Sequence, residues 1–170
     1  MCFSFMMKVE HPVNILPIYS EKQFFPRWLL LVIFLAPLIT YILSFAGIST
    51  KTVGFIPYFL IGPVLAGLLI GLANLKTELR PDGIYFRFTP LHLNWHRISK
   101  DEIEKIYIRK YSPIREFGGW GIRGLGDKRA YNTSGNMGIQ LELKNGKNIL
   151  FGTQKQEEWE KVIKESFADS

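Results

Sequence analysis

Two long apolar runs near the N-terminus constrain this chain more than any other feature. The 21 residues from Trp28 to Ile48 and the 23 residues from Val53 to Leu75 include no charged side chain. At a rise of about 1.5 Å per residue, each run would reach about 30 Å as a helix, the thickness of a bilayer core. Only residues 49–52 join them. The sequence therefore predicts a two-helix transmembrane hairpin over 28–75.

Two other interpretations fit these runs less well. A buried helix of a soluble protein usually keeps one polar face at this length, and these runs have none. A secretory signal peptide would be followed by a small-residue cleavage site and polar mature sequence, and neither precedes the second run.

The positive charges beside the runs predict an orientation. Three cations lie in the preceding segment 8–27 and three in the following segment 76–87, whereas the connecting loop has Lys51 alone. We therefore expect a multi-pass protein of the cytoplasmic membrane with both termini in the cytoplasm. Its parts are a tail over 1–27, the hairpin (28–48 and 53–75) and a cytoplasmic domain over 76–170. The tail offers three candidate translation starts, namely Met1, Met6 and Met7.

The hairpin itself carries few functional signals. Gly67 and Gly71 have the spacing of small residues that lets two helices approach closely. This leaves two alternatives open, packing within the hairpin and a homodimer face. No ionisable residue lies inside either run, so nothing indicates an ion path.

From Thr77 onward apolar and polar residues alternate, which is typical of strands. Strands are predicted around the turn Pro81–Gly83, near 95–98, over 103–111, over 137–144 and at 149–151. Asn145-Gly146 indicates a hairpin with a two-residue type I′ turn. Six or seven antiparallel strands are expected in all.

Residues typical of helix N-termini occur at two places in this domain. Ser99 with Glu102, and Thr153 with Gln156, have the spacing of capping boxes. After the second box, an amphipathic C-terminal helix is predicted, with one apolar stripe formed by Trp159, Val162, Ile163 and Phe167.

The order of these elements resembles the membrane-anchored bacterial proteins that carry one pleckstrin-homology-like (PH-like) domain after a transmembrane hairpin. The resemblance covers Trp28 to about Phe167. After the paired runs, it rests on the segments 80–84, 95–98, 103–106, 118–124, 145–147 and 151–153. It implies an α+β membrane protein whose partly open antiparallel β-barrel is capped by a C-terminal helix. It implies no known enzymatic reaction. The short turn 80–83, which contains Asp82, replaces the long basic loop with which eukaryotic PH domains bind phosphoinositides.

The segment 112–138 is the main candidate binding region. Its seven glycines permit bends and close backbone approach. Cations beside aromatic side chains suit contact with a phosphate-bearing surface or an acidic partner. The alternative is that the aromatic residues fill the barrel and the glycines only bend strands. The candidate binding residues are Arg115, Trp120, Arg123, Lys128, Arg129 and Tyr131.

No catalytic, metal or cofactor pattern is present. His92 and His96 lack further ligands of a zinc set, and Gly121–Gly126 lacks the surroundings of a phosphate loop. With Cys2 as its single cysteine, the chain has no internal disulfide. We therefore expect a non-enzymatic, membrane-tethered module whose domain binds a protein partner by a sheet edge or by the segment 112–138.

The alternative function is a sensor of anionic lipid headgroups or membrane stress that uses the basic segment 112–138. In it, Arg115, Arg123, Lys128 and Arg129 would contact headgroups, and the pI of about 9.4 suits an anionic surface. The predicted partners are the lipid bilayer and an unknown protein, with self-association left open and nucleic acid not expected.

Overall fold

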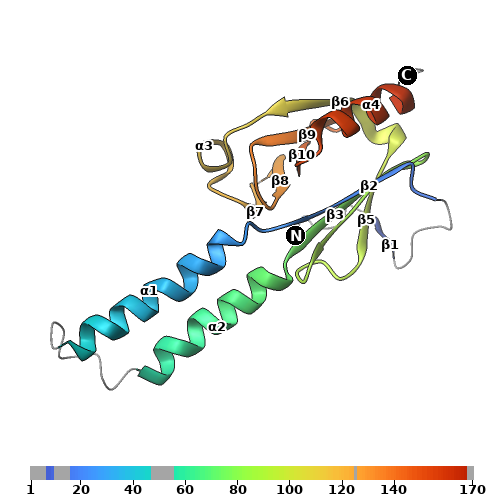
Figure 1. Cartoon of the computed structure of the whole chain (residues 1–170). Coiled ribbons are helices and arrows are strands. Elements are labelled where there is room, and N and C mark those ends of the chain that lie inside the picture. Colours follow the sequence, from blue (N-terminus) through green and yellow to red (C-terminus); the bar gives the residue numbers. More distant parts are fainter. Residues whose placement is uncertain (1–6, 10–15, 47–55, 125, 168–170) are drawn as a thin grey trace. The chain divides into compact units, whose positions relative to one another are not determined.

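The computed structural model describes residues 7–9, 16–46, 56–124 and 126–167. The chain divides into two compact units. One unit comprises Phe25–Ala73, and the other combines the N-terminal segment up to Phe24 with Asn74–Ser170. Figure 1 shows the first unit as two helices and the second as strands with shorter helices. Each unit is described by itself.

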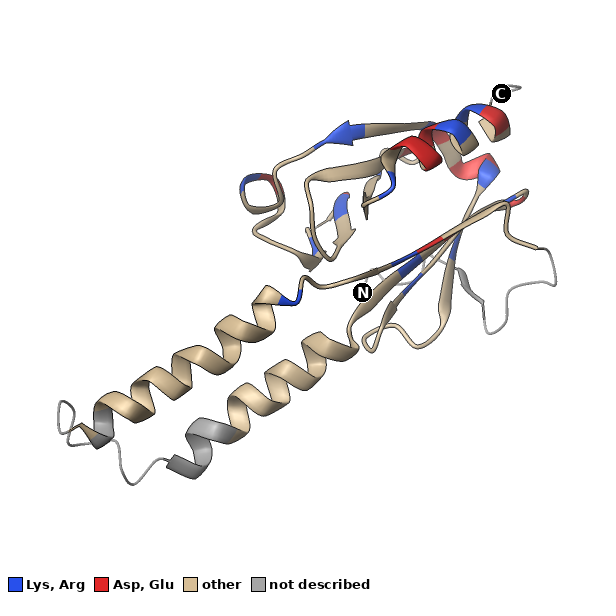
Figure 2. Ribbon diagram, in the orientation of Figure 1, with Lys and Arg blue, Asp and Glu red and all other residues tan. Residues whose placement is uncertain are grey.

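Two apolar helices, α1 (Trp28–Phe45) and α2 (Ile56–Leu72), form the first unit. Neither carries a charged residue (Figure 2). A Cβ added at Gly67 of α2 would lie 2.7 Å from Cζ of Phe34 in α1, so this glycine admits the ring of the facing helix. At Gly71, such an atom would meet nothing within 4 Å. Gly67 therefore serves packing between α1 and α2.

The length of these helices corrects the prediction of a transmembrane hairpin. Among the described residues, no helix is both long enough and apolar enough to cross a bilayer. Within the described ranges, α1 has 18 residues and α2 has 17, against apolar runs of 21 and 23 residues. The predicted membrane fold class and the predicted location in the cytoplasmic membrane are corrected with it, and the fold is α+β with two sheets.

The physical reason is that a count of apolar residues does not locate helix ends. α1 ends at Phe45, three residues before the end of the first apolar run, and α2 ends at Leu72. The predicted connecting loop and the start of the second run fall in 47–55, outside the described residues.

In the second unit, sheet A has five described strands in the order β1-β5-β4-β3-β2. All its pairings are antiparallel. The strands are β1 (Met7–Val9), β2 (Tyr19–Phe24), β3 (Asn74–Arg80), β4 (Gly83–Thr89) and β5 (Trp95–Ser99).

Sheet B also has five described strands, in the order β6-β9-β10-β8-β7. The pair β8 and β10 is parallel and the others are antiparallel. The strands are β6 (Ile103–Lys110), β7 (Gly121–Arg123), β8 (Lys128–Asn132), β9 (Met137–Leu143) and β10 (Asn148–Thr153). The helices of this unit are η2 (Lys100–Glu102), α3 (Pro113–Phe117) and α4 (Gln156–Phe167).

The strand inventory differs from the sequence expectation. The described residues form ten strands, one pair of them parallel, instead of six or seven antiparallel ones. β1 and β2 come from the N-terminal segment that was expected to be a tail. β7 and β8 come from the glycine-rich segment, where no alternating apolar pattern predicts strands.

The hydrophobic core lies between the two sheets and α4. The Phe86 ring of sheet A lies 4.7 Å from the Tyr131 ring and 4.8 Å from the Phe151 ring of sheet B, measured between centroids. Trp159 of α4 is fully buried, and the Tyr19 ring meets its edge at 4.9 Å. Burial of these large rings stabilises the unit, since each removes roughly 150–250 Å² from water.

A buried carboxylate joins β2 to the start of α4. Glu21 is only 4% exposed and accepts three hydrogen bonds. The donors are the Thr153 hydroxyl at 2.8 Å, the Gln154 amide at 2.9 Å and the Trp159 indole at 2.6 Å. Thr153 therefore binds Glu21 while also accepting from the Lys155 amide, which differs from the capping box predicted with Gln156.

Of two turns predicted from the sequence, the structure confirms one and corrects the other. The capping box of Ser99 and Glu102 is present and starts η2. At Asn145-Gly146 the turn is not type I′, because among the described residues only glycines have positive φ. Instead, the Gly146 amide donates to Leu143 and Gly146 has φ of +82°. This pattern is that of a three-residue hairpin with a glycine bulge.

Candidate functional site

The outer edge of sheet B is an unpaired strand of eight residues. β6 pairs with β9 on one side, and no described strand lies on its other side. A β-bulge at Glu104 shifts the register between Ile103 and Lys105, and bulges increase local twist. An edge strand presents unpaired backbone N–H and C=O groups, which form a template for a further strand.

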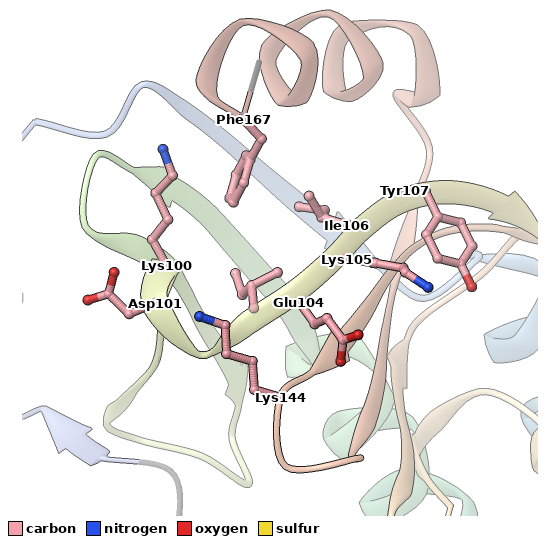
Figure 3. Close-up of a pocket in the computed structure, with 9 residues that line it drawn as sticks. Lys100, Asp101, Glu104, Lys105, Ile106, Tyr107, Lys144 and Phe167 are labelled. Carbon is pink, nitrogen blue, oxygen red and sulfur yellow. The ribbon is translucent and has the colours of Figure 1, made fainter. Parts of the chain in front are cut away.

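A groove of about 490 Å³ runs beside this edge. Figure 3 shows the Phe167 ring reaching down from α4 toward the strand that carries Ile106, with the Lys100 and Lys144 side chains near the end of the strand that lies away from Tyr107. The groove is lined by Lys100, Asp101, Ile103, Glu104, Lys105, Ile106, Tyr107, Lys144 and Phe167.

Helix α4 supplies the apolar wall of the groove. Its buried residues Trp159 and Ile163 fix the helix against the sheet, so its last residue, Phe167, lies at the edge. The Lys100 ammonium lies 4.9 Å from the centroid of the Phe167 ring and donates to the Ser166 carbonyl at 2.8 Å. A cation at the carboxyl end of a helix is stabilising. Both contacts hold the end of α4 beside η2.

The polar lining is mixed, with a positive excess. Three lysines face two carboxylates among the lining residues. Lys105 lies 3.8 Å from Glu142, a loose pair in an exposed position, while Glu142 also accepts from the Tyr107 hydroxyl at 2.8 Å. That hydrogen bond raises the pKa of Tyr107. The groove therefore offers an apolar wall, a free strand edge and a basic rim.

The candidate residues predicted from the sequence lie elsewhere and are mostly separate. Tyr131 is 1% exposed and packs in the core, where burial raises its pKa. The Trp120 indole donates to the Gly135 carbonyl at 3.2 Å, and Arg123 donates to the Trp120 carbonyl at 2.9 Å. Arg115 is exposed on α3.

Lys128 and Arg129 line one pocket of about 560 Å³ on sheet B. They are adjacent in β8, so their side chains point to opposite faces of the sheet. The pocket also contains Arg109, whose guanidinium lies 2.9 Å from the Glu116 carboxylate and donates to Gln140. The Arg109 charge is thus already compensated, which weakens the case for an anion site here.

The two histidines of the domain form a ring pair rather than a metal site. The His92 and His96 rings lie 4.6 Å apart, and His96 stacks on Phe86. Burial, and then the charges of His96 and Arg129, lowers the pKa of His92 to about 4. Within the described ranges, no group of three His, Cys, Asp or Glu side chains could hold a metal.

Sequence reasoning missed the groove because the edge status of β6 depends on strand order. The apolar pattern of 103–111 and the position of Phe167 at the end of the helical stripe were visible, and only the fold brings them together.

Comparison with known proteins gives no relative. No protein-family model, no curated protein and no solved structure matches the chain. The resemblance to PH-like proteins therefore remains a prediction.

Proposed function

We propose that this chain is a non-enzymatic protein-binding module that takes an extended peptide segment of a partner protein along β6. The observation that carries the proposal is the unpaired edge of β6 beside an open groove. In strand addition, backbone hydrogen bonds to a sheet edge supply affinity, and pockets for alternate side chains supply specificity.

The groove chemistry defines the peptide. Ile103, Ile106 and Phe167 would receive apolar side chains on one face of the added strand. The ammonium groups of Lys105 and Lys144 suit acidic side chains at alternate positions, since successive strand residues point to opposite faces. The ligand is thus an extended segment in which apolar and acidic residues alternate.

The charge of the edge favours such a peptide over a second copy of the chain. β6 carries Lys105 and Lys110 against Glu104, while Arg109 on the same strand is already paired with Glu116. Two copies of this strand would bring like charges together, and basic residues on an edge strand oppose self-pairing. The same charges attract an acidic strand.

The test starts from peptides selected for binding. Decapeptides displayed on phage would be selected against the immobilised full-length chain, synthesised, and measured by fluorescence anisotropy. We expect the enriched peptides to alternate apolar and acidic residues. Phe167→Ala should weaken their binding about tenfold, roughly 1.4 kcal/mol, and Lys144→Glu should weaken it by a similar factor. Lys161→Ala, an exposed change on α4, is the matched control.

Amide hydrogen exchange locates the bound peptide. Bound peptide should slow exchange of alternate β6 amides, because those amides gain hydrogen bonds. The proposal fails if no peptide is enriched, if Phe167→Ala binds as tightly as Lys161→Ala, or if exchange along β6 does not change.

A further inference from the structure

Three cationic side chains form a row across sheet A. Lys22 of β2 is directly opposite Lys76 of β3, and Lys76 is directly opposite Arg87 of β4. Directly opposite residues in antiparallel strands point to the same face, and neighbouring strands lie about 4.8 Å apart. The row therefore spans about 10 Å on one face.

This row lies on the outer face of the sheet. The next positions along the same strands are Gln23, Leu75 and Phe88, which are also in register and are at most 2% exposed. Because side chains alternate between faces, Lys22, Lys76 and Arg87 point away from the core. Figure 2 shows basic residues on strands of this sheet.

The row carries more positive charge than its neighbours compensate. On this face the described residues include five cations and two carboxylates, namely Lys22, Lys76, Arg80, Arg87 and Arg97 with Glu78 and Asp82. Each carboxylate is engaged: Glu78 binds Lys76 at 2.7 Å and also Arg80, and Asp82 lies 3.1 Å from Arg97.

The ionisation of Glu78 supports this balance. Burial raises the pKa of its carboxyl, but hydrogen bonds from Lys76 and Arg80 and the charges of both outweigh burial, so the net shift is downward. Glu78 is therefore ionised and committed to these two cations. Within the described ranges, Lys22 and Arg87 form no ion pair.

Aromatic rings hold the cations in place. The Arg87 guanidinium lies 5.1 Å and the Lys76 ammonium 5.2 Å from the centroid of the Trp95 ring. The Lys22 ammonium lies 4.8 Å from the Phe24 ring. Cation–π contacts of this kind orient a cation without neutralising its charge. The row is therefore preorganised and still positive.

One buried donor in the row is unsatisfied. Nε of Arg87 is buried and has no hydrogen-bond partner among the described residues. Buried polar groups are nearly always hydrogen-bonded, so the Trp95 ring and not an acceptor within the described residues orients this guanidinium, and an anion would meet its outer N–H groups. Arginine binds phosphate oxygens through two parallel N–H groups, and its hydrogen bonds to charged oxyanions are strong.

We propose that Lys22, Lys76 and Arg87 form a binding site for a phosphate group, with Arg87 as the hydrogen-bonding anchor and Lys22 as the second uncompensated charge. A phosphate dianion matches two uncompensated cations better than a carboxylate does. This site lies on sheet A and is independent of the peptide groove on sheet B, so either proposal can fail alone.

The experiment titrates the full-length chain with inorganic pyrophosphate, followed by isothermal calorimetry and tryptophan fluorescence. We expect saturable binding near or below ~1 mM, weakening as salt increases. Arg87→Gln should weaken binding at least tenfold and Lys22→Gln three- to fivefold. Lys161→Gln removes one charge from the distant helix α4 and should leave affinity unchanged.

Two further measurements separate site from fold and identify the source of phosphate. Lys22 is exposed, so Lys22→Gln tests the site even if Arg87→Gln does not fold. Glycerol 3-phosphate and dioctanoyl phosphatidic acid would then be compared. Tighter binding of either one, weakened three- to fivefold in Lys22→Gln, assigns the source and supports the site. The proposal is overturned if pyrophosphate does not bind, or if Lys161→Gln weakens binding as much as Lys22→Gln.

Discussion

Removing the Glu21 carboxylate should destabilise the second unit by about 3 kcal/mol. In Glu21→Ala, three donors lose their acceptor: the Thr153 hydroxyl, the Gln154 amide and the Trp159 indole. Thr153 and Trp159 are at most 2% exposed, so water cannot replace the lost oxygens without opening the core. The residues involved lie far apart in the sequence, which makes this contact a test of whether β2 belongs to the fold.

The magnitude follows from the cost of each orphaned donor. A buried donor without a partner costs about 1–3 kcal/mol, and relief of the buried charge offsets part of the total for three donors. A net loss of about 3 kcal/mol should lower Tm by about 12 °C in a unit of this size. Glu21→Gln keeps the volume and one acceptor oxygen, so we expect about half that loss.

Urea unfolding followed by tryptophan fluorescence and circular dichroism measures the change. The midpoint should fall while the m-value stays constant, since the same surface is exposed on unfolding. Glu165→Ala, an exposed change on α4, is the control and should stay within about 0.5 kcal/mol of the original chain. If Glu21→Ala is as stable as Glu165→Ala, the anchoring role of β2 is refuted.

Two other perturbations have calculable outcomes. Gly83→Ala should lower the free energy of unfolding by about 3 kcal/mol or more, because a Cβ there would lie 2.2 Å from the Ile98 carbonyl oxygen and φ is +149°. Gly118→Ala, where φ is +74° and no atom lies within 4 Å, should lower it by about 1 kcal/mol. Equal losses of stability in thermal unfolding would contradict this geometry. His92 has a pKa of about 4 in the folded chain, lowered by burial and then by His96 and Arg129. Its neutral ring therefore contributes its full share to the free energy of unfolding above pH 6.5. This contribution should fall as the pH drops from 6.5 toward 4, because the unfolded chain takes up the proton first. Because the ring is only half-buried, we expect a loss of about 1–2 kcal/mol; His92→Asn should flatten this part of the stability–pH curve, and an unchanged slope would show that other groups cause it.

Local sequence signals predicted the local structure well. The capping box of Ser99 and Glu102, the alternation around 137–143 and the apolar stripe of α4 each depend on residues a few positions apart. Such patterns follow directly from backbone geometry, since side chains return to the same face every two residues in a strand and about every 3.6 residues in a helix. The turn at Asn145 shows the limit of this reasoning, because the same dipeptide serves two hairpin geometries.

The candidate site was predicted less well. Side chains were chosen in the segment 112–138 by residue type, but type does not determine exposure, and Tyr131 fills the core while Trp120 and Arg123 bind backbone carbonyls. An aromatic residue between cations has the same sequence signature in either setting. Only its neighbours in space separate the two.

The sequence by itself determined where most strands and the helix α4 form, and that the two runs 28–48 and 53–75 are uncharged and apolar. The tertiary structure decided the rest: that α1 and α2 are shorter than the apolar runs, that β2 joins sheet A, that β6 is an edge, and that Lys22 meets Lys76 and Arg87. The physical reason is distance along the chain. Periodicity is fixed by neighbouring residues, whereas strand order, edges and the meeting of charges from separate strands follow from burial of the whole core.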